Sequence, residues 1–378
     1  MRDSPGVDVS PGKSLEEQGE FMERQETDLV ARIPAVLKER RELGLEGLVG
    51  GLDAVIISTE QDRLEPAVAG LLRYTGLSVR GQFEDDIFRT FVLGTEGSAH
   101  FLVRARKRGE NPFLAVNMAE KTLPLPNTRL ETFVYRTRDL DRYVEIQNER
   151  GVRFLTPGII DNHHFRYIQT VPSPYTGNST GFIEWSGEEG NYAPVSARIC
   201  PAKPEKPGYP HLSCIHELDH TATRVRAMER NDAILEFMSL TSYRFDFAVF
   251  VRSLNSITSV ARLEHEGYAQ VFTSGIEPYR DVLSSGPTEL FIRHYGTRVH
   301  HMAFRTEEIE DTFSALKNDG MEFLVELVGS PEEGLHQTFS MPSPHTLLVN
   351  EYIHRYEGFG GFFTRSNVEL LTRATGRQ

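Results

Sequence analysis

Two adjacent histidines, His300 and His301, stand in an apolar stretch, RVHHMAFRT (298–306), that has the composition of a buried strand. Gly296 precedes this stretch, and an acidic segment typical of a helix start follows it. A histidine in such a strand is either a core residue whose ring nitrogens bond to backbone groups or a metal ligand. Further ligands elsewhere in the chain are needed to favour the second interpretation.

The sequence contains an internal repeat. Comparison of its units shows which residues of the other half stand at the positions of the histidines. A pattern of strand, helix and several strands occurs four times, in units that begin near residues 52, 130, 218 and 299. The second and fourth units match at a displacement of 169 residues, and the first and third match at 166. The matched pairs include Arg136 with Arg305, Gly151 with Gly320, Phe154 with Phe323, and Leu52 with Leu218. We therefore predict an α+β fold of two similar halves, each made of two βαβββ units.

The repeat shows that packing alone does not require two of the histidines. His220 stands where the first half has Ala54, and His301 stands where it has Thr132. Glu351 lies in the last strand of the fourth unit. Two imidazoles and one carboxylate on three strands of a curved sheet form a facial set that leaves other coordination positions open, as in non-haem Fe(II) oxygenases.

Other conspicuous polar residues receive a structural interpretation. In a regular strand His300 points away from His301, so only one of the two can face a metal. His216 shares a strand face with the histidine of the third unit and is a candidate for supporting it from behind. Glu184 echoes Glu351 in the repeat but lacks histidine partners, and we interpret it as a surface or interface acid.

Charge and composition exclude several classes of partner. The 378-residue chain carries a formal net charge of −13, so we expect no surface that follows nucleic-acid phosphates. Cys200 and Cys214 are too few for a disulfide framework and are expected to be reduced thiols. No stretch approaches the roughly 18 uninterrupted apolar residues of a membrane span, and the N-terminus has no apolar signal region. We therefore expect a cytoplasmic protein that binds neither nucleic acid nor membrane.

Domain organisation follows from the repeat and from the breaks between its units. Residues 1–50 are expected to form an arm, to about residue 14, and a charged helical extension from Leu15 to about Leu43. Residues 51–193 would form an N-terminal domain without metal ligands, and residues 214–357 a C-terminal catalytic domain. Segment 194–213 is rich in proline, which fixes φ and lacks a backbone donor, so we interpret it as a linker.

The C-terminal half resembles 4-hydroxyphenylpyruvate dioxygenase and its relatives in the vicinal oxygen chelate superfamily. The resemblance covers about residues 215 to 370 and rests on six stretches in order: Leu218-Asp219-His220, Leu254-Asn255-Ser256, Val299 to Phe304, Gln337-Thr338-Phe339, Glu351 to Arg355, and Gly358 to Phe362. It implies the glyoxalase-like fold, in which each half is an open, curved, mixed β-sheet barrel with outer helices. It also implies a C-terminal helix over residues 358–378 that covers the site, and a homodimer or homotetramer.

The same resemblance implies roles for individual residues. His220, His301 and Glu351 would hold Fe(II), and a 2-oxo acid would chelate the ion through its carboxylate and keto oxygens. Four further positions would lie around the substrate cavity: Gln337 and Ser256 beside the substrate, Phe339 in the wall, and Phe359 near the mouth on the C-terminal helix.

This chain also departs from the family pattern, at positions that concern substrate choice. Relatives carry polar or aromatic residues where this sequence has Ile276, Glu289, His300 and Val349. Because a hydrogen-bonding pocket discriminates strongly against substrates that lack the matching group, these changes mean that 4-hydroxyphenyl specificity does not follow from the resemblance. The metal set is kept while the polar recognition set is not.

The sequence therefore predicts an Fe(II)-dependent dioxygenase that uses O₂ to decarboxylate and hydroxylate a 2-oxo acid, with both oxygen atoms incorporated into products. Within this class, homogentisate-forming, mandelate-forming and extradiol ring-cleaving enzymes remain alternatives. A non-oxidative metal enzyme of the same superfamily, an isomerase or lyase with another divalent ion, is the alternative from a different class.

Overall fold

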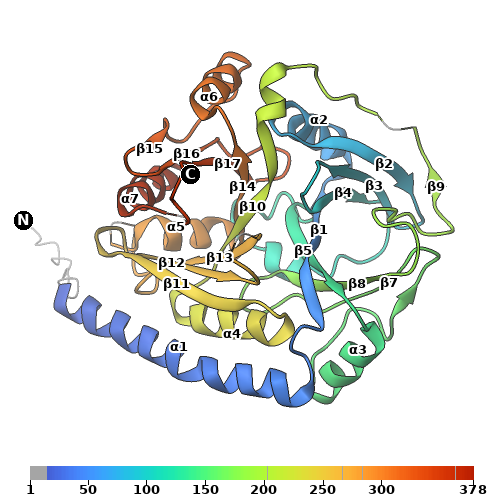
Figure 1. Cartoon of the computed structure of the whole chain (residues 1–378), viewed down its shortest axis with the longest axis horizontal. Coiled ribbons are helices and arrows are strands. Elements are labelled where there is room, and N and C mark those ends of the chain that lie inside the picture. The colour runs from blue at the N-terminus through green and yellow to red at the C-terminus, as the bar shows by residue number, and fades with distance from the viewer. Residues whose placement is uncertain (1–14, 202, 266, 283, 362) are drawn as a thin grey trace, which may run out of the picture.

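Two curved sheets lie side by side in the computed structural model, which describes residues 15–201, 203–265, 267–282, 284–361 and 363–378 (Figure 1). The first sheet has the order β6 (Ile160–Asp161), β7 (Phe165–Gln169), β8 (Ser179–Trp185), β5 (Arg129–Thr137), β1 (Val49–Thr59), β4 (His100–Arg106), β3 (Phe88–Gly94), β2 (Ser78–Glu84) and β9 (Arg198–Ile199). The second has the order β11 (Arg244–Val251), β12 (Ser256–Arg262), β13 (Ala269–Ser274), β10 (Ile215–Arg224), β14 (Arg298–Thr306), β17 (Val349–Arg355), β16 (Leu335–Phe339) and β15 (Val328–Ser330).

The predicted α+β fold and fourfold repeat are confirmed by these sheets. Each unit is a strand, a helix and three strands, beginning with β1, β5, β10 and β14. The repeat helices are α2 (Leu64–Tyr74), α3 (Leu140–Glu149), α4 (Arg230–Leu240) and α6 (Ile309–Asn318). Apart from the edge strand β9, the two sheets have the same topology, with the first strands of paired units antiparallel at the centre. We call the part built on the first sheet the first half and the part built on the second sheet the second half.

A shared core joins the two halves, because the central strands of both sheets place buried apolar side chains on the faces that meet. Phe101 of β4 stacks on Phe304 of β14 with ring centroids 5.9 Å apart, and one cluster of buried residues spans both halves. Two buried arginines add a symmetric contact. Arg298 donates to the carbonyl oxygen of Thr128 at 2.7 Å, and Arg129, at the corresponding position, donates to that of Thr297 at 3.3 Å. The opposite faces of the central strands are left to line the inside of each half.

Three helices lie outside the repeat: α1 (Leu15–Leu43), α5 (Gly286–Tyr295) and α7 (Arg365–Ala374). Helix α1 confirms the predicted helical extension and packs along α4 of the same chain (Figure 1). Arg32 forms an ion pair with Asp232 at 2.7 Å, and the buried Arg40 donates to the carbonyl oxygen of Tyr243 at 2.7 Å. The expected N-terminal arm lies outside the described residues.

The proline-rich segment is more than a linker. Residues Arg198–Ile199 within it form β9, which pairs with Phe83 and Glu84 at the edge of the first sheet. The prediction of a segment without regular structure is wrong at this point, because a two-residue pairing is too short to produce a periodic pattern. No helix among the described residues combines the length and apolar character that crossing a membrane requires.

Candidate metal centre

Two imidazoles and one carboxylate meet inside the second half. His220 comes from β10, His301 from β14 and Glu351 from β17, and their ligand atoms all lie within 4.8 Å of one another. The Nε2 atoms of both histidines lie 3.2 Å from Oε2 of Glu351. His220 and Glu351 are fully buried, and His301 is 7% exposed. This is the set of side chains that the sequence predicted for a metal.

The pairing of three strands brings the cluster together. Ala303 of β14 is opposite His220 on one side and opposite Glu351 on the other. His301 is two residues from Ala303, so its side chain lies on the same face of β14. The small side chain of Ala303 leaves the space between the three larger ones open.

Two β-bulges give two of the ligands a polar neighbour on the same side of the sheet. In β10 the register shifts at Asp219, and in β14 it shifts at His300. A bulge places two consecutive side chains opposite one residue of the partner strand, so neighbours no longer alternate between faces. The expectation that His300 points away from His301 is therefore wrong, and the two rings lie 5.1 Å apart.

Each bulge residue fixes the orientation of a ligand. Nδ1 of His220 donates to Oδ1 of Asp219 at 2.7 Å, since an ionised carboxylate only accepts. Arg355 holds the same carboxylate, with contacts of 2.5 and 3.0 Å. Nε2 of His220 is then the nitrogen that carries the lone pair and faces the cluster. The sequence had suggested His216 for this supporting role, but Nε2 of His216 lies 3.2 Å from Oε2 of Glu307 instead.

The second histidine is oriented by a chain of hydrogen bonds. Nε2 of His300 lies 2.9 Å from Oε1 of Gln378, and Nδ1 of His300 lies 2.8 Å from Nδ1 of His301. If the amide oxygen accepts from His300, then Nδ1 of His300 accepts from Nδ1 of His301. Nε2 of His301 then carries the lone pair, as Nε2 of His220 does. A ligating imidazole usually has such a hydrogen-bond partner on its other nitrogen, most often a carboxylate, a backbone carbonyl or water.

The carboxylate of Glu351 is anchored on one oxygen only. Nε2 of Gln337 donates to its Oε1 at 2.7 Å, and Asn367 of α7 donates to Oε1 of Gln337 at 3.1 Å. Among the described residues neither Oε2 of Glu351 nor Nε2 of His301 makes a hydrogen bond of normal geometry. Buried polar atoms normally have a partner, so these atoms fit an ion that accepts their lone pairs.

The protein alone holds the two histidines in different protonation states. Burial lowers the pKa of His220, but the carboxylates of Glu351 and Asp219 outweigh it and raise that pKa to about 9. Burial and then the neighbouring charges of His300, His220 and Arg224 lower the pKa of His301 well below its usual range. The cluster thus provides one carboxylate and at least one neutral imidazole at neutral pH, and an ion would displace the remaining proton on binding.

Comparison with solved structures identifies the fold. No protein-family model matches the sequence, and no curated protein matches it by sequence. Among solved structures, a triply substituted variant of 4-hydroxymandelate synthase from Streptomyces coelicolor is similar at 15% identity, with a TM-score of 0.66, and the match covers 87% of this chain and 98% of that one. The chain has the vicinal oxygen chelate fold.

A second solved structure of this fold is a fusion protein of a xylose isomerase-like TIM barrel and 4-hydroxyphenylpyruvate dioxygenase. It is similar at 13% identity, with a TM-score of 0.60, and this chain spans 52% of its length. The resemblance predicted from the sequence is confirmed at the level of the fold by both structures.

A small cavity of about 40 Å³ borders the cluster, between the inner face of the second sheet and α7. Ser256 and Phe339, predicted around the substrate, both line it, and the Phe339 ring lies 4.7 Å from that of His301. Gln337 is not in the cavity wall, because its side chain holds Glu351 and Asn367 as described above. Phe363 also lines the cavity, and its ring lies 5.9 Å from that of His220.

The predicted position of Phe359 on the C-terminal helix is wrong. Helix α7 begins at residue 365, and Phe359 lies in the segment before it, packed against Ala303, Leu335 and Ile353. Phe363, four residues later, is the aromatic residue that reaches the cavity. The sequence offered Phe363 as an alternative to Phe359, since both phenylalanines belong to the same glycine-rich segment.

Three other positions depart from the family pattern: Ile276, Glu289 and Val349. All three are buried, but they do not line this cavity. Ile276 packs in a turn whose backbone bonds to Asn255 at 3.4 Å. Glu289 of α5 accepts from the backbone of Ala227 at 3.0 Å and from that of Gly275 at 3.1 Å. Val349 packs against Phe339 and α7 in a small cluster. Their direct structural contribution is to hold the walls in place.

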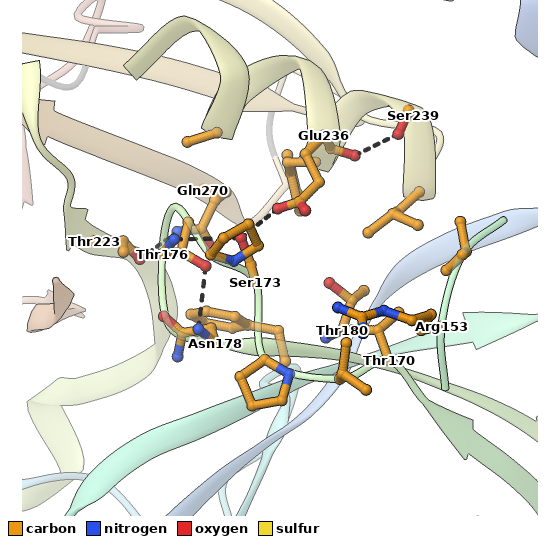
Figure 2. A pocket seen from close by; sticks show the side chains of 18 of the residues that line it. Arg153, Thr170, Ser173, Thr176, Asn178, Thr180, Thr223, Glu236, Ser239 and Gln270 are labelled. Carbon is orange, nitrogen blue, oxygen red and sulfur yellow. Dashed lines mark hydrogen bonds between the residues drawn. The ribbon is translucent and has the colours of Figure 1, made fainter. Parts of the chain in front are cut away.

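A larger cavity of about 360 Å³ lies between the two halves, on the other face of the central strands (Figure 2). Figure 2 shows Thr223 and Gln270 of the second half beside Thr176 and Asn178 of the first. Thr223 and His220 are an odd number of residues apart on β10, so they face opposite sides of the strand. This cavity therefore does not open onto the metal cluster from these strands.

Proposed function

We propose that the chain is an Fe(II)-dependent dioxygenase that acts on a 2-oxo acid. The observation that carries the proposal is the buried cluster of His220, His301 and Glu351, in which every ligand is anchored on its far side and directs one atom to a common point. The vicinal oxygen chelate fold supports it, because the two similar structures are a 4-hydroxymandelate synthase variant and a 4-hydroxyphenylpyruvate dioxygenase fusion.

A ferrous ion held by these residues supplies the redox chemistry with O₂ and a positive charge that binds the carboxylate and keto oxygens of the substrate. In the overall reaction one O₂ is consumed and carbon 1 of the 2-oxo acid leaves as CO₂. One oxygen atom enters the new carboxylate at carbon 2, and the other becomes a hydroxyl group on the same product. No separate 2-oxoglutarate is needed.

The chain's own residues hold the reactants and keep water away. Asp219 and His300 fix the tautomers of the two histidines, and Gln337 leaves one oxygen of Glu351 facing inward. Val368 and Leu371 of α7 are buried and close the cavity over the cluster. Exclusion of water strengthens the electrostatic interactions of a bound anion and prevents side reactions.

The test is anaerobic loading of the metal-free protein with Fe(II), followed by a panel of 2-oxo acids. We expect one equivalent of iron and a weak visible absorption band when a keto acid chelates it. Admission of air should then cause O₂ uptake and release of an equal amount of CO₂. Bound iron with neither signal from any keto acid would contradict the dioxygenase proposal and favour a non-oxidative enzyme.

A further inference from the structure

A buried arginine stands in the wall of the cavity beside the metal cluster. Arg224 is the last residue of β10 and follows His220 by four positions, so both side chains lie on the inner face of the strand. It is 4% exposed, and His301 and Phe339 border the same cavity. Its charge is close enough to contribute to the lowered pKa of His301, after burial and the other histidines.

The guanidinium of Arg224 has few protein partners. Among the residues that the structure describes, one acceptor contacts it, the carbonyl oxygen of Pro287, at 3.3 Å from Nη1. The ring of Phe291 lies 4.5 Å from the guanidinium carbon. Burial, which no carboxylate opposes, lowers the pKa of Arg224 to about 9. Because a guanidinium has five N–H donors, most of its donors remain for a ligand.

The first half shows how this fold otherwise accommodates a cation inside the sheet. Arg104 of β4 forms an ion pair with the buried carboxylate of Glu131. Glu131 is the bulge residue of β5 and corresponds to His300 in β14. Arg104 is opposite Ser58 of β1 in the first sheet. In the second sheet, the residue of β10 that corresponds to Ser58 is Arg224. In the second half, a buried arginine, Arg224, therefore lies near the corresponding place on the sheet. The carboxylate of Glu131 is replaced there by the imidazole of His300.

Arg298 is equally buried and donates to a carbonyl oxygen, so burial alone does not call for a ligand. Arg224 differs because it faces the cavity beside the cluster, where a buried charge favours a charged partner. The rest of the cavity wall suits the polar end of a small molecule, with hydroxyl groups from four strand and helix positions: Ser256, Thr258, Thr273 and Thr288. A cavity of about 40 Å³ holds roughly three water molecules, whereas an apolar cavity that binds benzene has about 150 Å³. That space matches one polar group such as a carboxylate next to the guanidinium, and it does not hold an aromatic ring.

We propose that Arg224 binds a second carboxylate of the substrate, so that the substrate is a short 2-oxo acid with a carboxylate at the far end of its side chain. This inference rests on the proposed function, which places the keto-acid end at the metal cluster. The unused N–H groups of Arg224 would make charge-assisted hydrogen bonds to the far carboxylate. That group stays unchanged in the reaction, and the product is a hydroxylated dicarboxylic acid one carbon shorter.

The test compares two acids of equal length, 2-oxoadipate and 2-oxohexanoate, which differ in the second carboxylate. Dissociation constants are measured by calorimetry on the Zn(II)-loaded protein and by the visible band on the anaerobic Fe(II) protein. We expect 2-oxoadipate to bind at least about 10-fold more tightly than 2-oxohexanoate or phenylpyruvate, as for a charge-assisted pair. Arg224→Met should remove this preference and leave the affinity for 2-oxohexanoate unchanged, and Arg224→Lys should keep part of it.

Arg226→Met is the matched control, because Arg226 is exposed and pairs with Glu229 outside the cavity. It should keep the wild-type preference. Equal affinities of the wild-type protein for the two acids would overturn the inference even if no Arg224 variant folds. So would an unchanged preference in Arg224→Met, or equal weakening of both acids, which would place Arg224 at the carboxylate beside the keto group.

The two proposals fail in different ways. If the Zn(II) protein prefers the dicarboxylic acid but the Fe(II) protein consumes no O₂ with it, the dioxygenase proposal fails and the assignment of Arg224 stands. If O₂ is consumed with a monocarboxylic keto acid and the second carboxylate brings no preference, the assignment of Arg224 fails alone. Failure of every keto acid to bind the Zn(II) protein would overturn the inference as well.

Discussion

The two halves of this protein use one strand arrangement for opposite purposes. In the first half the inside of the sheet is filled, with Phe165, Trp185 and Tyr192 packed in one cluster around buried aliphatic residues. In the second half the inside holds the cluster of His220, His301 and Glu351 and a cavity. The comparison shows that the same strand arrangement accommodates either content.

The strand registers show which residues of the two halves correspond. Val134 of β5 is opposite Gly181 of β8, just as Ala303 of β14 is opposite Glu351 of β17. The counterpart of Glu351 is therefore Gly181. The interpretation of Glu184 as its echo is wrong, and Glu184 instead accepts from the backbone of Leu140 at 3.0 Å.

The bulges are present in both halves, but their side chains have different partners. Asp53, the counterpart of Asp219, accepts from Trp185 at 3.0 Å and from Tyr192 at 2.7 Å. Thus the carboxylate that orients an imidazole in the second half anchors aromatic side chains in the first. The polar support of the cluster therefore stands at bulge positions that both halves share.

The largest expected effect comes from removing the carboxylate of the cluster. Glu351→Ala should abolish turnover and the binding of stoichiometric iron, because two histidines alone do not complete the facial set. Iron content and O₂ uptake measure this. The matched control is Glu184→Ala on the corresponding strand, which should retain iron. Activity in a folded Glu351→Ala protein would refute the ligand assignment.

A smaller effect is expected from the residue behind His220. Asp219→Asn keeps a hydrogen-bond acceptor for Nδ1 but removes the charge, and loss of such support typically lowers metal affinity about 10- to 100-fold. Competition with a chelator measures the change. Asp53→Asn, at the corresponding bulge, should lower stability without changing metal affinity. If both variants bind metal as the wild type does, Asp219 has no special role.

Sequence reasoning could identify the fold from the repeat, and the three clustered residues from the ordered motifs of the family resemblance. The repeat supported the two histidines because it placed Ala54 and Thr132 at their positions. Sequence reasoning could not identify the supporting residues, because a β-bulge shifts one residue without changing the apolar pattern. For this reason His300 was assigned to the wrong face, and Asp219 received no role.

Long-range arrangement limited the rest of the prediction. The counterpart of Glu351 was misplaced because the displacement between β8 and β17 is 170 residues, whereas matching Glu184 with Glu351 assumes 167. The burial of Arg224 depends on α5, which lies outside the repeat, and on α7, so no local pattern indicated it.

A third prediction tests whether the first half has room for a ligand. A Cβ atom at Gly181 would lie 2.8 Å from the hydroxyl oxygen of Tyr167 and 3.2 Å from a methyl carbon of Thr132. Gly181→Ala should therefore destabilise the protein by about 1–3 kcal/mol, the usual cost of overpacking. Urea unfolding measures it. Gly81→Ala in β2, where nothing lies within 4 Å, is the control and should be nearly neutral. Equal stability of the two variants would show that the first half is not filled at this position.

The smallest expected effect is a pH dependence specific to the first half. His100 lies beside Tyr192, and burial, partly opposed by Asp53, lowers its pKa below the ordinary 6.5. The unfolded chain then binds a proton at His100 more readily than the folded one, so this residue's contribution to stability is complete above pH 6.5 and decreases as the pH falls through and below it. In His100→Gln the free energy of unfolding should decrease less between pH 7 and pH 5 than in the wild type. Urea unfolding at a series of pH values measures the difference, and parallel curves for the two proteins would show that His100 is not the titrating group. A difference would confirm that the interior of the first half holds His100 in its neutral form.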